Sequence, residues 1–472
     1  MNKLIPFPDQ VEVIDDIRAQ MRSSKSILLQ SCTGSGKTVM AMIMVMAALE
    51  KGGRVGFTVP RRNLLEQTSN SFKAAGISHS YIAAGKFTNP NGRCFIGSIE
   101  TMSRRIDKLP PLNLVFFDET HFGSNSLGKV IDHYKNMGAW VIGLSATPWK
   151  LSGRGLGCWY DSMVTGKSMR WLIDNKRLSD YRYFVGANRP NTESLRMSAG
   201  DYNKADLASL MESAGTIIGD CVKDYRDRSM GRLHVTRCAS IKHSQMTAQA
   251  FRDNGIPAAH VDGKTDDIEM RRIIRGFARR ELYVLTFCDL LNFGFDLAQS
   301  SGMDVCIESG SDLKPSKSLA GQMQFWGRML RMKEYPAIIN DHVNNWVEHG
   351  FPCTDRLWTL ADRPQKKNKA TETIATKRCD NCYHLHRPMP KCPECGFVYE
   401  IVSREIEEED GELIEVDPRK AIIDRKKEQY EAKDIDSLAA VGRKRGMKYP
   451  EKWAVKVMAA RMKKERLTQL NK

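Results

Sequence analysis

The sequence has no apolar run long enough to cross a membrane. Its longest uninterrupted apolar stretch, Val39 to Leu49, falls well short of the roughly 18 residues that indicate a membrane-spanning helix. The first residues, Met1 to Pro6, also lack the apolar segment of a secretory signal. We therefore expect a cytoplasmic protein without membrane partners.

Acidic residues are few relative to basic ones. The chain holds 56 Asp and Glu against 72 Lys and Arg, a formal net charge of +16. Such an excess favours polyanion partners, and nucleic acid is the first to consider. The alternative is a basic surface that only keeps the protein in solution. Hydrophobic residues at 41% and charged residues at 27% exclude a wholly disordered or collagen-like chain.

Cysteine has no regular spacing over most of the chain, although there are 12 in total. The exception is two Cys-x-x-Cys pairs close together, formed by Cys379, Cys382, Cys392 and Cys395. Two such pairs supply four thiolates for one tetrahedral Zn²⁺. We predict a zinc site of four sulfurs. The alternatives are that His384 or His386 replaces one thiolate, or that the four thiols are buried without a metal.

Short apolar segments alternate with helical patterns in two parts of the chain. The expected strands are Ile27–Leu29, Val55–Val59, Phe95–Ile96, Leu114–Phe117 and Val141–Leu144, and then Leu233–Val235, Ala258–Val261, Tyr283–Leu285 and Val305–Ile307. This alternation is typical of parallel α/β sheets. We predict two tandem α/β domains, residues 1–150 and 215–365, joined by a connecting segment at 151–214.

The remaining residues differ in composition. A polar linker at 364–369 precedes a zinc-binding module at 375–402, an acidic run at 405–415 reads as a solvated connector, and residues 417–472 form a basic, mainly helical tail. In the tail, Glu451–Arg466 is expected to be a helix with Trp453, Val457 and Ala460 on one face. Such a stripe either packs the helix onto its own protein or leaves its basic side chains to bind nucleic acid.

Ser31–Thr38 reads Ser-Cys-Thr-Gly-Ser-Gly-Lys-Thr, follows an expected strand and precedes an apolar helix. This is the context of a Walker A loop, although Ser31 stands where the general pattern has glycine. The loop backbone can surround the phosphates of ATP, Lys37 can reach the β- and γ-phosphate oxygens, and the Thr38 hydroxyl can ligate Mg²⁺. The predicted nucleotide-binding residues are Thr33, Gly34, Ser35, Gly36, Lys37 and Thr38.

Asp118 and Glu119 stand at the end of the expected strand Leu114–Phe117. A strand-end aspartate can hold Mg²⁺ together with Thr38, and the adjacent glutamate can orient and activate the attacking water. An Asp-Glu pair alone would be an ordinary exposed turn. Its place behind a phosphate loop favours the catalytic interpretation.

Two later motifs complete a family resemblance. Ser145-Ala146-Thr147 follows the next expected strand, and the run from Gln324 to Arg331 reads Gln-Phe-Trp-Gly-Arg-Met-Leu-Arg. With TGSGKT and DETH, these segments resemble motifs I, II, III and VI of superfamily 2 helicases, and are most similar to RadD-like DNA repair helicases and their phage-encoded relatives. The resemblance implies that the two predicted domains are RecA-like.

The resemblance also implies roles for single residues. Gln10 would read adenine, although Phe7 stands where the family usually has arginine. Gln324, Arg328 and Arg331 would act on the γ-phosphate from the second domain, and Asp296 would also face the nucleotide. The residues implied to couple nucleotide to strand are His121, Ser145, Thr147 and Gly294, and those implied to hold strand phosphates are Pro60, Arg61, Gln67, Ser98 and Thr101.

The resemblance favours an ATP-dependent DNA helicase of DNA repair, recombination or replication in a bacterial or phage-infected bacterial cell. ATP, Mg²⁺ and Zn²⁺ would be its cofactors. Nucleic acid would be its main partner, with DNA favoured over RNA, and replication or repair proteins such as single-stranded DNA-binding protein would be further partners. Two alternatives stay open: a DNA or RNA translocase or remodeller that does not separate strands, and a zinc-containing nucleic-acid-binding adaptor switched by ATP.

Overall fold

The structure is a computed structural model of the whole chain. It describes residues 4–60, 63–86, 88–150, 152–186, 190–198, 200–288, 303, 305–362, 376–399, 428–444 and 449–470. Arg61, Gly294, Asp296, the linker at 364–369 and the acidic run at 405–415 lie outside these residues. The chain forms two compact units, Met1–Tyr399 and Glu400–Lys472.

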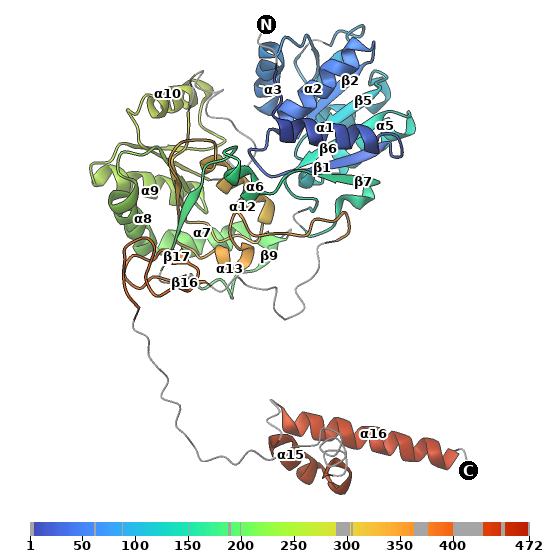
Figure 1. Cartoon of the computed structure of the whole chain (residues 1–472), viewed down its shortest axis with the longest axis vertical. Coiled ribbons are helices and arrows are strands. Elements are labelled where there is room, and N and C mark those ends of the chain that lie inside the picture. Colours follow the sequence, from blue (N-terminus) through green and yellow to red (C-terminus); the bar gives the residue numbers. More distant parts are fainter. Residues whose placement is uncertain are drawn as a thin grey trace. The chain divides into compact units, whose positions relative to one another are not determined.

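The first sheet of the larger unit has seven parallel strands in the order β3-β4-β2-β5-β6-β1-β7 (Figure 1). The strands are β1 (Ser26–Gln30), β2 (Val55–Val59), β3 (Ser80–Ile82), β4 (Cys94–Ser98), β5 (Leu114–Phe117), β6 (Trp140–Ser145) and β7 (Ser162–Thr165). Successive side chains of a strand point to opposite faces. Ile27 and Leu29 accordingly join one apolar layer and Leu28 joins the other.

Helices cover both faces of this sheet. The layer containing Ile27 packs against α1 (Pro8–Gln20), α2 (Lys37–Glu50) and α3 (Asn63–Ala74). The layer containing Leu28 packs against α4 (Ile99–Arg104) and α5 (Asn125–Asn136). Short 3₁₀ turns η1 (Ile106–Lys108), η2 (Thr120–Phe122) and η3 (Leu156–Cys158) complete the domain.

The second sheet has six parallel strands in the order β12-β13-β11-β14-β15-β8. The strands are β8 (Tyr181–Val185), β11 (His234–Arg237), β12 (Ala258–Val261), β13 (Val284–Phe287), β14 (Ser309–Asp312) and β15 (Ala337–Asp341). The accompanying helices are α6 (Met169–Asp174), α7 (Lys204–Ser213), α8 (Gly215–Ser229), α9 (Ile241–Asp253), α10 (Asp267–Ala278), α12 (Leu319–Met329) and α13 (Trp346–His349), and β9 (Met197–Ser198) pairs with β10 (Asp201–Tyr202). The predicted fold class, two parallel-sheet α/β domains, is confirmed.

One expected strand was misplaced. Val305–Ile307 is not a strand, and the neighbour of β11 is the polar segment β14. Its side chains are buried because β11 pairs with them: the His234 ring lies 2.8 Å from the Ser309 hydroxyl, and Arg237 forms an ion pair with Asp312. A strand that is buried through polar pairing carries no apolar signal in the sequence.

The segment 151–214, expected to connect the domains, contributes a strand to each sheet. β7 pairs with β1 at an edge of the first sheet, and β8 pairs with β15 at an edge of the second. Three of the four residues of β7 are not fully buried, as suits an edge strand, so the sequence shows no apolar run there. The chain therefore passes from the first sheet to the second after Thr165, the last residue of β7, and before Tyr181, the first residue of β8.

The described residues of the smaller unit include the helices α15 (Ile435–Lys444) and α16 (Pro450–Leu470). The second is longer than the predicted helix Glu451–Arg466. Trp453 and Val457 pack onto a small core of Ala432, Leu438, Ala439 and Ala454, so the apolar stripe packs α16 onto its own unit. Lys452 and Lys456 are exposed. None of the described helices combines the length and apolar character that a membrane crossing requires.

Candidate functional site

The predicted motif residues of the first domain gather at one edge of its sheet. In a parallel sheet all strands end at the same edge, where ligands of α/β proteins bind. The phosphate loop follows β1, Asp118 follows β5 and Ser145 ends β6. Because β5, β6 and β1 are adjacent, the topology brings motifs I, II and III together.

The phosphate loop wraps around the Lys37 side chain. The Lys37 Nζ donates hydrogen bonds to the carbonyl oxygens of Ser31 (2.9 Å) and Cys32 (3.3 Å). Gly34 and Gly36 have φ angles of 87° and 84°, a left-handed conformation that glycine adopts without steric cost. Since α2 begins at Lys37, the amide groups of its first turn face the loop and form an anion-binding cradle with the lysine.

Gln10 lies beside this cradle and is buried. Its Nε2 donates to the Ser35 carbonyl (3.0 Å), and its Oε1 accepts from the Phe7 amide (3.1 Å). The guanidinium of Arg177 lies over the Phe7 ring, 2.9 Å from its centroid, and 3.3 Å from the Asp9 carboxylate. An arginine therefore reaches this region from the connecting segment, although the sequence has phenylalanine at the family's arginine position.

Asp118 and Glu119 lie behind the loop at the end of β5. Burial and the neighbouring charge of Glu119 raise the pKa of Asp118 to about 7, against the opposing effect of Lys37. Burial also raises the pKa of Glu119, but hydrogen bonding to His121, the charges of His121 and Lys37, and the amide of Gln324 lower it overall. Glu119 is therefore held ionised, the form that can accept a proton from water.

Polar contacts link motif II to motif III. The Glu119 Oε2 lies 3.2 Å from the His121 Nδ1, which lies 3.2 Å from the Ser145 Oγ. The Ser145 hydroxyl donates to the Thr147 carbonyl (2.7 Å) and accepts from the Thr147 amide (3.2 Å). A shift of the motif III loop would therefore be transmitted to the side chain of Glu119.

Helix α12 brings motif VI against the phosphate loop. A Cβ placed on Gly327 would lie 2.4 Å from the Thr33 Cβ, so only glycine permits this approach. One turn earlier, Gln324 approaches Glu119, and Arg328 follows Gly327 directly. Arg331 forms a backbone bridge with Leu178, whose side chain would contact a Cβ on Gly34. The structure thus brings Gly327 and Gln324 to the site of motifs I and II, and Arg328 and Arg331 lie close to them in the chain.

The residues predicted to hold strand phosphates lie farther along the same edge. Pro60 follows β2 and Ser98 ends β4, where it is paired with Val59 across the sheet. The Ser98 hydroxyl donates to the Thr101 Oγ1 (2.8 Å), and Gln67 lies partly exposed on α3. The strand-contact role of these residues stays a prediction.

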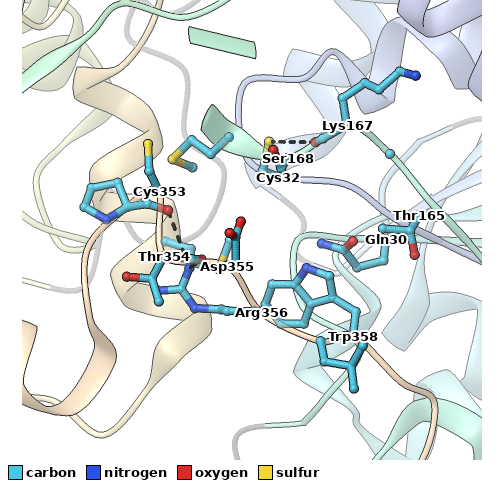
Figure 2. Close-up of a pocket in the computed structure, with 15 residues that line it drawn as sticks. Gln30, Cys32, Thr165, Lys167, Ser168, Cys353, Thr354, Asp355, Arg356 and Trp358 are labelled. Atoms are coloured by element: carbon cyan, nitrogen blue, oxygen red, sulfur yellow. Dashed lines mark hydrogen bonds between the residues drawn. The ribbon is translucent and has the colours of Figure 1, made fainter. Parts of the chain in front are cut away.

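A cavity of about 420 Å³ lies next to the phosphate loop (Figure 2). Its walls are Gln30 and Cys32, the segment Thr165–Met169, Met323, and the segment Pro352–Trp358. No feature of the sequence indicated that Pro352–Trp358 reaches this region. The signal that could have found it is Trp149, two residues after Thr147 of motif III, because a large aromatic side chain at that position packs against a partner.

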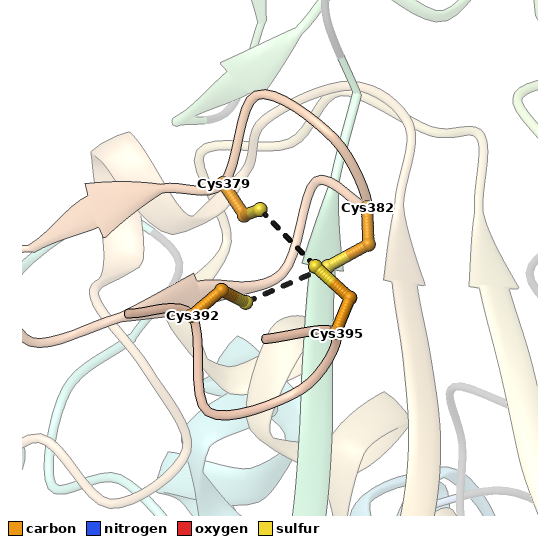
Figure 3. A group of neighbouring side chains, drawn as sticks. All are labelled: Cys379, Cys382, Cys392 and Cys395. Carbon is orange, nitrogen blue, oxygen red and sulfur yellow. Dashed lines mark hydrogen bonds between the residues drawn. The ribbon is translucent and has the colours of Figure 1, made fainter. Parts of the chain in front are cut away.

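The four predicted zinc ligands converge (Figure 3). All four sulfur atoms lie within 4.8 Å of one another, and Cys379–Cys395 and Cys382–Cys392 are 3.6 and 3.7 Å apart. A Zn–S bond of about 2.3 Å gives sulfur separations of about 3.8 Å in a tetrahedron, so the residues fit the metal. Burial and the neighbouring thiols raise the pKa of Cys382, an effect that a bound cation would reverse.

The two histidines of the module, His384 and His386, contact other residues and not the four sulfur atoms. The His386 Nε2 lies 2.7 Å from the Tyr399 hydroxyl, and the His384 ring packs against Phe184. Among the described residues, the metal-binding group contains cysteines only. The geometry therefore favours four sulfur ligands over a site with histidine.

The zinc module is docked on the second sheet. Its strands are β16 (Lys377–Arg378) and β17 (Leu385–His386), and His384 forms an antiparallel bridge with Phe184 of β8. Arg228 donates to the Cys382 carbonyl (3.2 Å), and Arg182 forms an ion pair with Glu394. The module thus covers the edge of β8 that β15 leaves open.

Zinc removal is expected to affect more than the module. The purified protein should contain about one zinc per chain, and Cys379→Ser should lower this content sharply and reduce the melting temperature, because metal binding supplies the module's folding energy. Elemental analysis and thermal unfolding measure both effects, with Cys158→Ser, an exposed cysteine of the first domain, as the control. Wild-type protein with far less than one zinc, purified without chelator, would exclude the site.

Comparison with known proteins agrees with this arrangement. The family model described as "Type III restriction enzyme, res subunit" matches residues 3–150. A 51.5 kDa protein of Lactococcus phage (isolate 7-9) is 31% identical over 406 residues, covering 85% of this chain and 83% of the phage protein. IRC3 of Saccharomyces cerevisiae, named as a candidate ATP-dependent helicase, is 27% identical over 344 residues, covering 68% of this chain and 49% of IRC3.

A solved structure has the same fold. The fragment structure of a candidate HsdR subunit of a type I restriction enzyme from Vibrio vulnificus YJ016 superposes with a TM-score of 0.57 at 17% identity, covering 74% of this chain and 66% of that chain. The fold, the order of the motifs and the relatives together define the class. The chain belongs to the superfamily 2 helicases. The narrower resemblance to RadD-like DNA repair helicases stays a prediction.

Proposed function

We propose that the protein is a nucleic-acid-dependent ATPase that acts as an ATP-dependent DNA helicase. The observation that carries this proposal is the contact of α12 with the phosphate loop, where Gly327 meets Thr33 and Gln324 approaches Glu119. Residues of both domains therefore meet beside the phosphate loop, where the nucleotide would bind. Such a site makes hydrolysis depend on how the two domains are arranged.

Each side chain of the site has a role in this proposal. The loop amides and Lys37 bind the phosphates of ATP, and Gln10 lies where it can contact the base. Thr38 and Asp118 would hold Mg²⁺, which supplies charge neutralisation at the phosphates when bound. Glu119 orients the attacking water and accepts its proton. Arg328 and Arg331 stabilise the charge that develops on the γ-phosphate.

A nucleic-acid strand would lie along the ends of β2 and β4, where Pro60, Gln67, Ser98 and Thr101 are placed. Arg61 belongs to the same proposed strand contact, and His121, Ser145, Thr147 and Gly294 are proposed to couple the nucleotide to the strand. The net charge of +16 supports a polyanion partner. The preference for DNA over RNA, a role in repair, recombination or replication with protein partners, and a cytoplasmic site of action rest on the family resemblance and on the phage relative.

ATP turnover measured with and without nucleic acid tests this function. We expect single-stranded DNA to raise turnover several-fold, and RNA of matched length to raise it less, at one stated salt concentration. Strand displacement on a tailed duplex then separates a helicase from a translocase that moves without unwinding. Turnover that neither DNA nor RNA changes would contradict the proposal and favour an adaptor switched by ATP.

The basic tail is expected to add nucleic-acid affinity without contributing to catalysis. A chain ending at Arg404 keeps the larger unit, so basal ATP turnover should stay within about twofold of wild type. Since Lys452 and Lys456 are exposed, loss of the tail should weaken DNA binding, and the salt dependence should become shallower by about 0.7 log units per lost phosphate contact on a single strand. Binding titrations at several salt concentrations measure both. An unchanged affinity and slope would reject a role of the tail in binding.

A further inference from the structure

The segment from Phe351 to Arg356 is anchored on the second domain. The Arg356 guanidinium donates hydrogen bonds to the carbonyl oxygens of His349 (2.7 Å), Phe351 (3.0 Å) and Thr354 (2.8 Å). The Phe351 ring stacks on Trp346 with 5.8 Å between centroids and meets the edge of Tyr183 in β8. Arg356 therefore closes this segment into a compact loop on the second sheet.

The next residues, Trp358 to Asp362, are anchored on the first domain. The rings of Trp358 and Trp149 lie 5.1 Å apart, and the Trp149 Nε1 donates to the Ala361 carbonyl (2.9 Å). The Gly157 amide donates to the Leu360 carbonyl (3.0 Å). The backbones approach so closely that a Cβ on Gly155 would lie 2.0 Å from the Leu360 oxygen. Any side chain at position 155 would clash with this oxygen, so the contact requires glycine there.

The anchored turn is the continuation of motif III. Trp149 stands two residues after Thr147, and the Leu156 amide closes the turn by donating to the Pro148 carbonyl (3.0 Å). Thr147 is hydrogen-bonded to Ser145, and Ser145 contacts His121, the partner of Glu119. The segment thus holds the loop whose position bears on the proposed catalytic glutamate.

The two anchors are separated by one residue. Leu357 is 87% exposed. It lies between Arg356, which is bonded within the loop of the second domain, and Trp358, whose ring meets Trp149 of the first domain and also packs on the apolar cluster of the second. Successive Cα atoms are about 3.8 Å apart, so the segment has no slack. Figure 2 shows the side chains of Arg356 and Trp358 on this segment, with Cys353 and Thr354 on one side and Gln30 and Thr165 on the other. The connecting segment at Thr165–Met169 lines the same cavity.

We propose that residues 351–362 are a taut strap that transmits the position of the second domain to motif III, and that Trp358 is the positioning residue at its end. A change in the arrangement of the two domains then displaces Trp149 and, through Thr147 and Ser145, the partners of Glu119. The strap is the element through which a bound nucleic-acid strand alters ATP turnover. This inference rests on the proposed function, since it concerns the coupling of the two activities.

The decisive test lengthens the strap without removing an anchor. An insertion of about ten Gly and Ser residues after Leu357 keeps every anchoring side chain but makes the segment flexible. We expect basal ATP turnover and the KM for ATP within about twofold of wild type, and at least a fivefold loss of the stimulation by an oligo(dT) or oligo(rU) strand of about 30 nucleotides. Binding of the oligonucleotide, measured by fluorescence anisotropy, should change less than threefold.

Substitutions at the two anchors test the same coupling. Trp358→Ala and Arg356→Ala should each reduce the stimulation by oligonucleotide, and Trp358→Phe should restore most of it because the ring contact with Trp149 is kept. Leu357→Ala is the matched control on the same strap. Thermal unfolding checks that each variant is folded, and the insertion variant gives an independent result where a substitution fails to fold.

The outcomes separate this inference from the proposed function. Wild-type turnover that neither oligonucleotide stimulates would overturn both. Stimulation in the wild type that survives the insertion unchanged would overturn the strap alone and leave the proposed function standing. A reduced stimulation in Leu357→Ala equal to that in Trp358→Ala would also overturn the role of Trp358.

Discussion

Glu119→Gln is expected to lower the turnover of ATP by about 10² to 10⁴-fold, the usual contribution of a general base, while ATP binding is kept. The amide cannot accept the proton of the attacking water, but it preserves the shape of the site beside His121 and Gln324.

Lys37→Ala should lower turnover as strongly and also weaken ATP binding, because the ammonium group of Lys37 lies among the loop carbonyls where the phosphates would be held.

Single-turnover hydrolysis and a titration with a fluorescent ATP analogue distinguish the two variants. Glu50→Gln, an exposed glutamate at the end of α2, is the control and should behave as wild type. Turnover by Glu119→Gln at the wild-type rate would remove Glu119 from the catalytic role. Unchanged nucleotide affinity in Lys37→Ala would contradict the placement of the phosphates on this loop.

Arg331→Ala is expected to have the second large effect, a loss of about 10³-fold or more in turnover with a much smaller loss in ATP affinity. An arginine that reaches the γ-phosphate from a second domain stabilises charge mainly in the transition state, and such residues contribute about 10³ to 10⁵ to turnover. Arg331→Lys should recover little, since lysine lacks the planar guanidinium fork.

The matched control is Arg279→Ala, an arginine of the second domain that pairs with Glu281 at its surface at 3.9 Å. Its turnover should equal that of wild type. Equal losses of affinity and turnover in Arg331→Ala would argue against a transition-state role. A normal turnover with Arg328→Ala and a loss with Arg331→Ala would assign the role to Arg331 alone.

Strands that are apolar throughout could be predicted from the sequence, whereas the polar strand β14 and the strand β15, whose apolar run is short, could not. Val55–Val59 and Leu114–Phe117 have the bounds that the sequence indicated, and every residue of both strands is buried. Continuous apolar runs are typical of strands buried on both faces. β14 was missed because its burial depends on the partners of its hydroxyl and carboxylate groups on β11. β7, at an edge of the first sheet, was missed because three of its four residues are not fully buried and it has no apolar run.

In the candidate site, too, features with a local sequence pattern could be predicted, and features that depend on contacts between distant parts of the chain could not. Motifs I, II and III could be located because each follows an apolar strand, and the topology of parallel strands then puts them at one edge. The contact of Gly327 with Thr33 depends on how two domains pack, which no local pattern contains. The strap was missed for a related reason: Trp358 and Trp149 are far apart in the sequence, and their contact follows from the path of the chain between the domains.

The placement of the zinc module has a consequence for synthesis on the ribosome. β8 forms near the start of the second domain, and its open edge is covered by residues 376–399, which are translated after every other strand of that sheet. A nascent chain that has completed β15 therefore still presents an uncovered strand edge, and such edges promote pairing with other chains. This edge is covered only after Cys395, the last cysteine of the module, has left the ribosome.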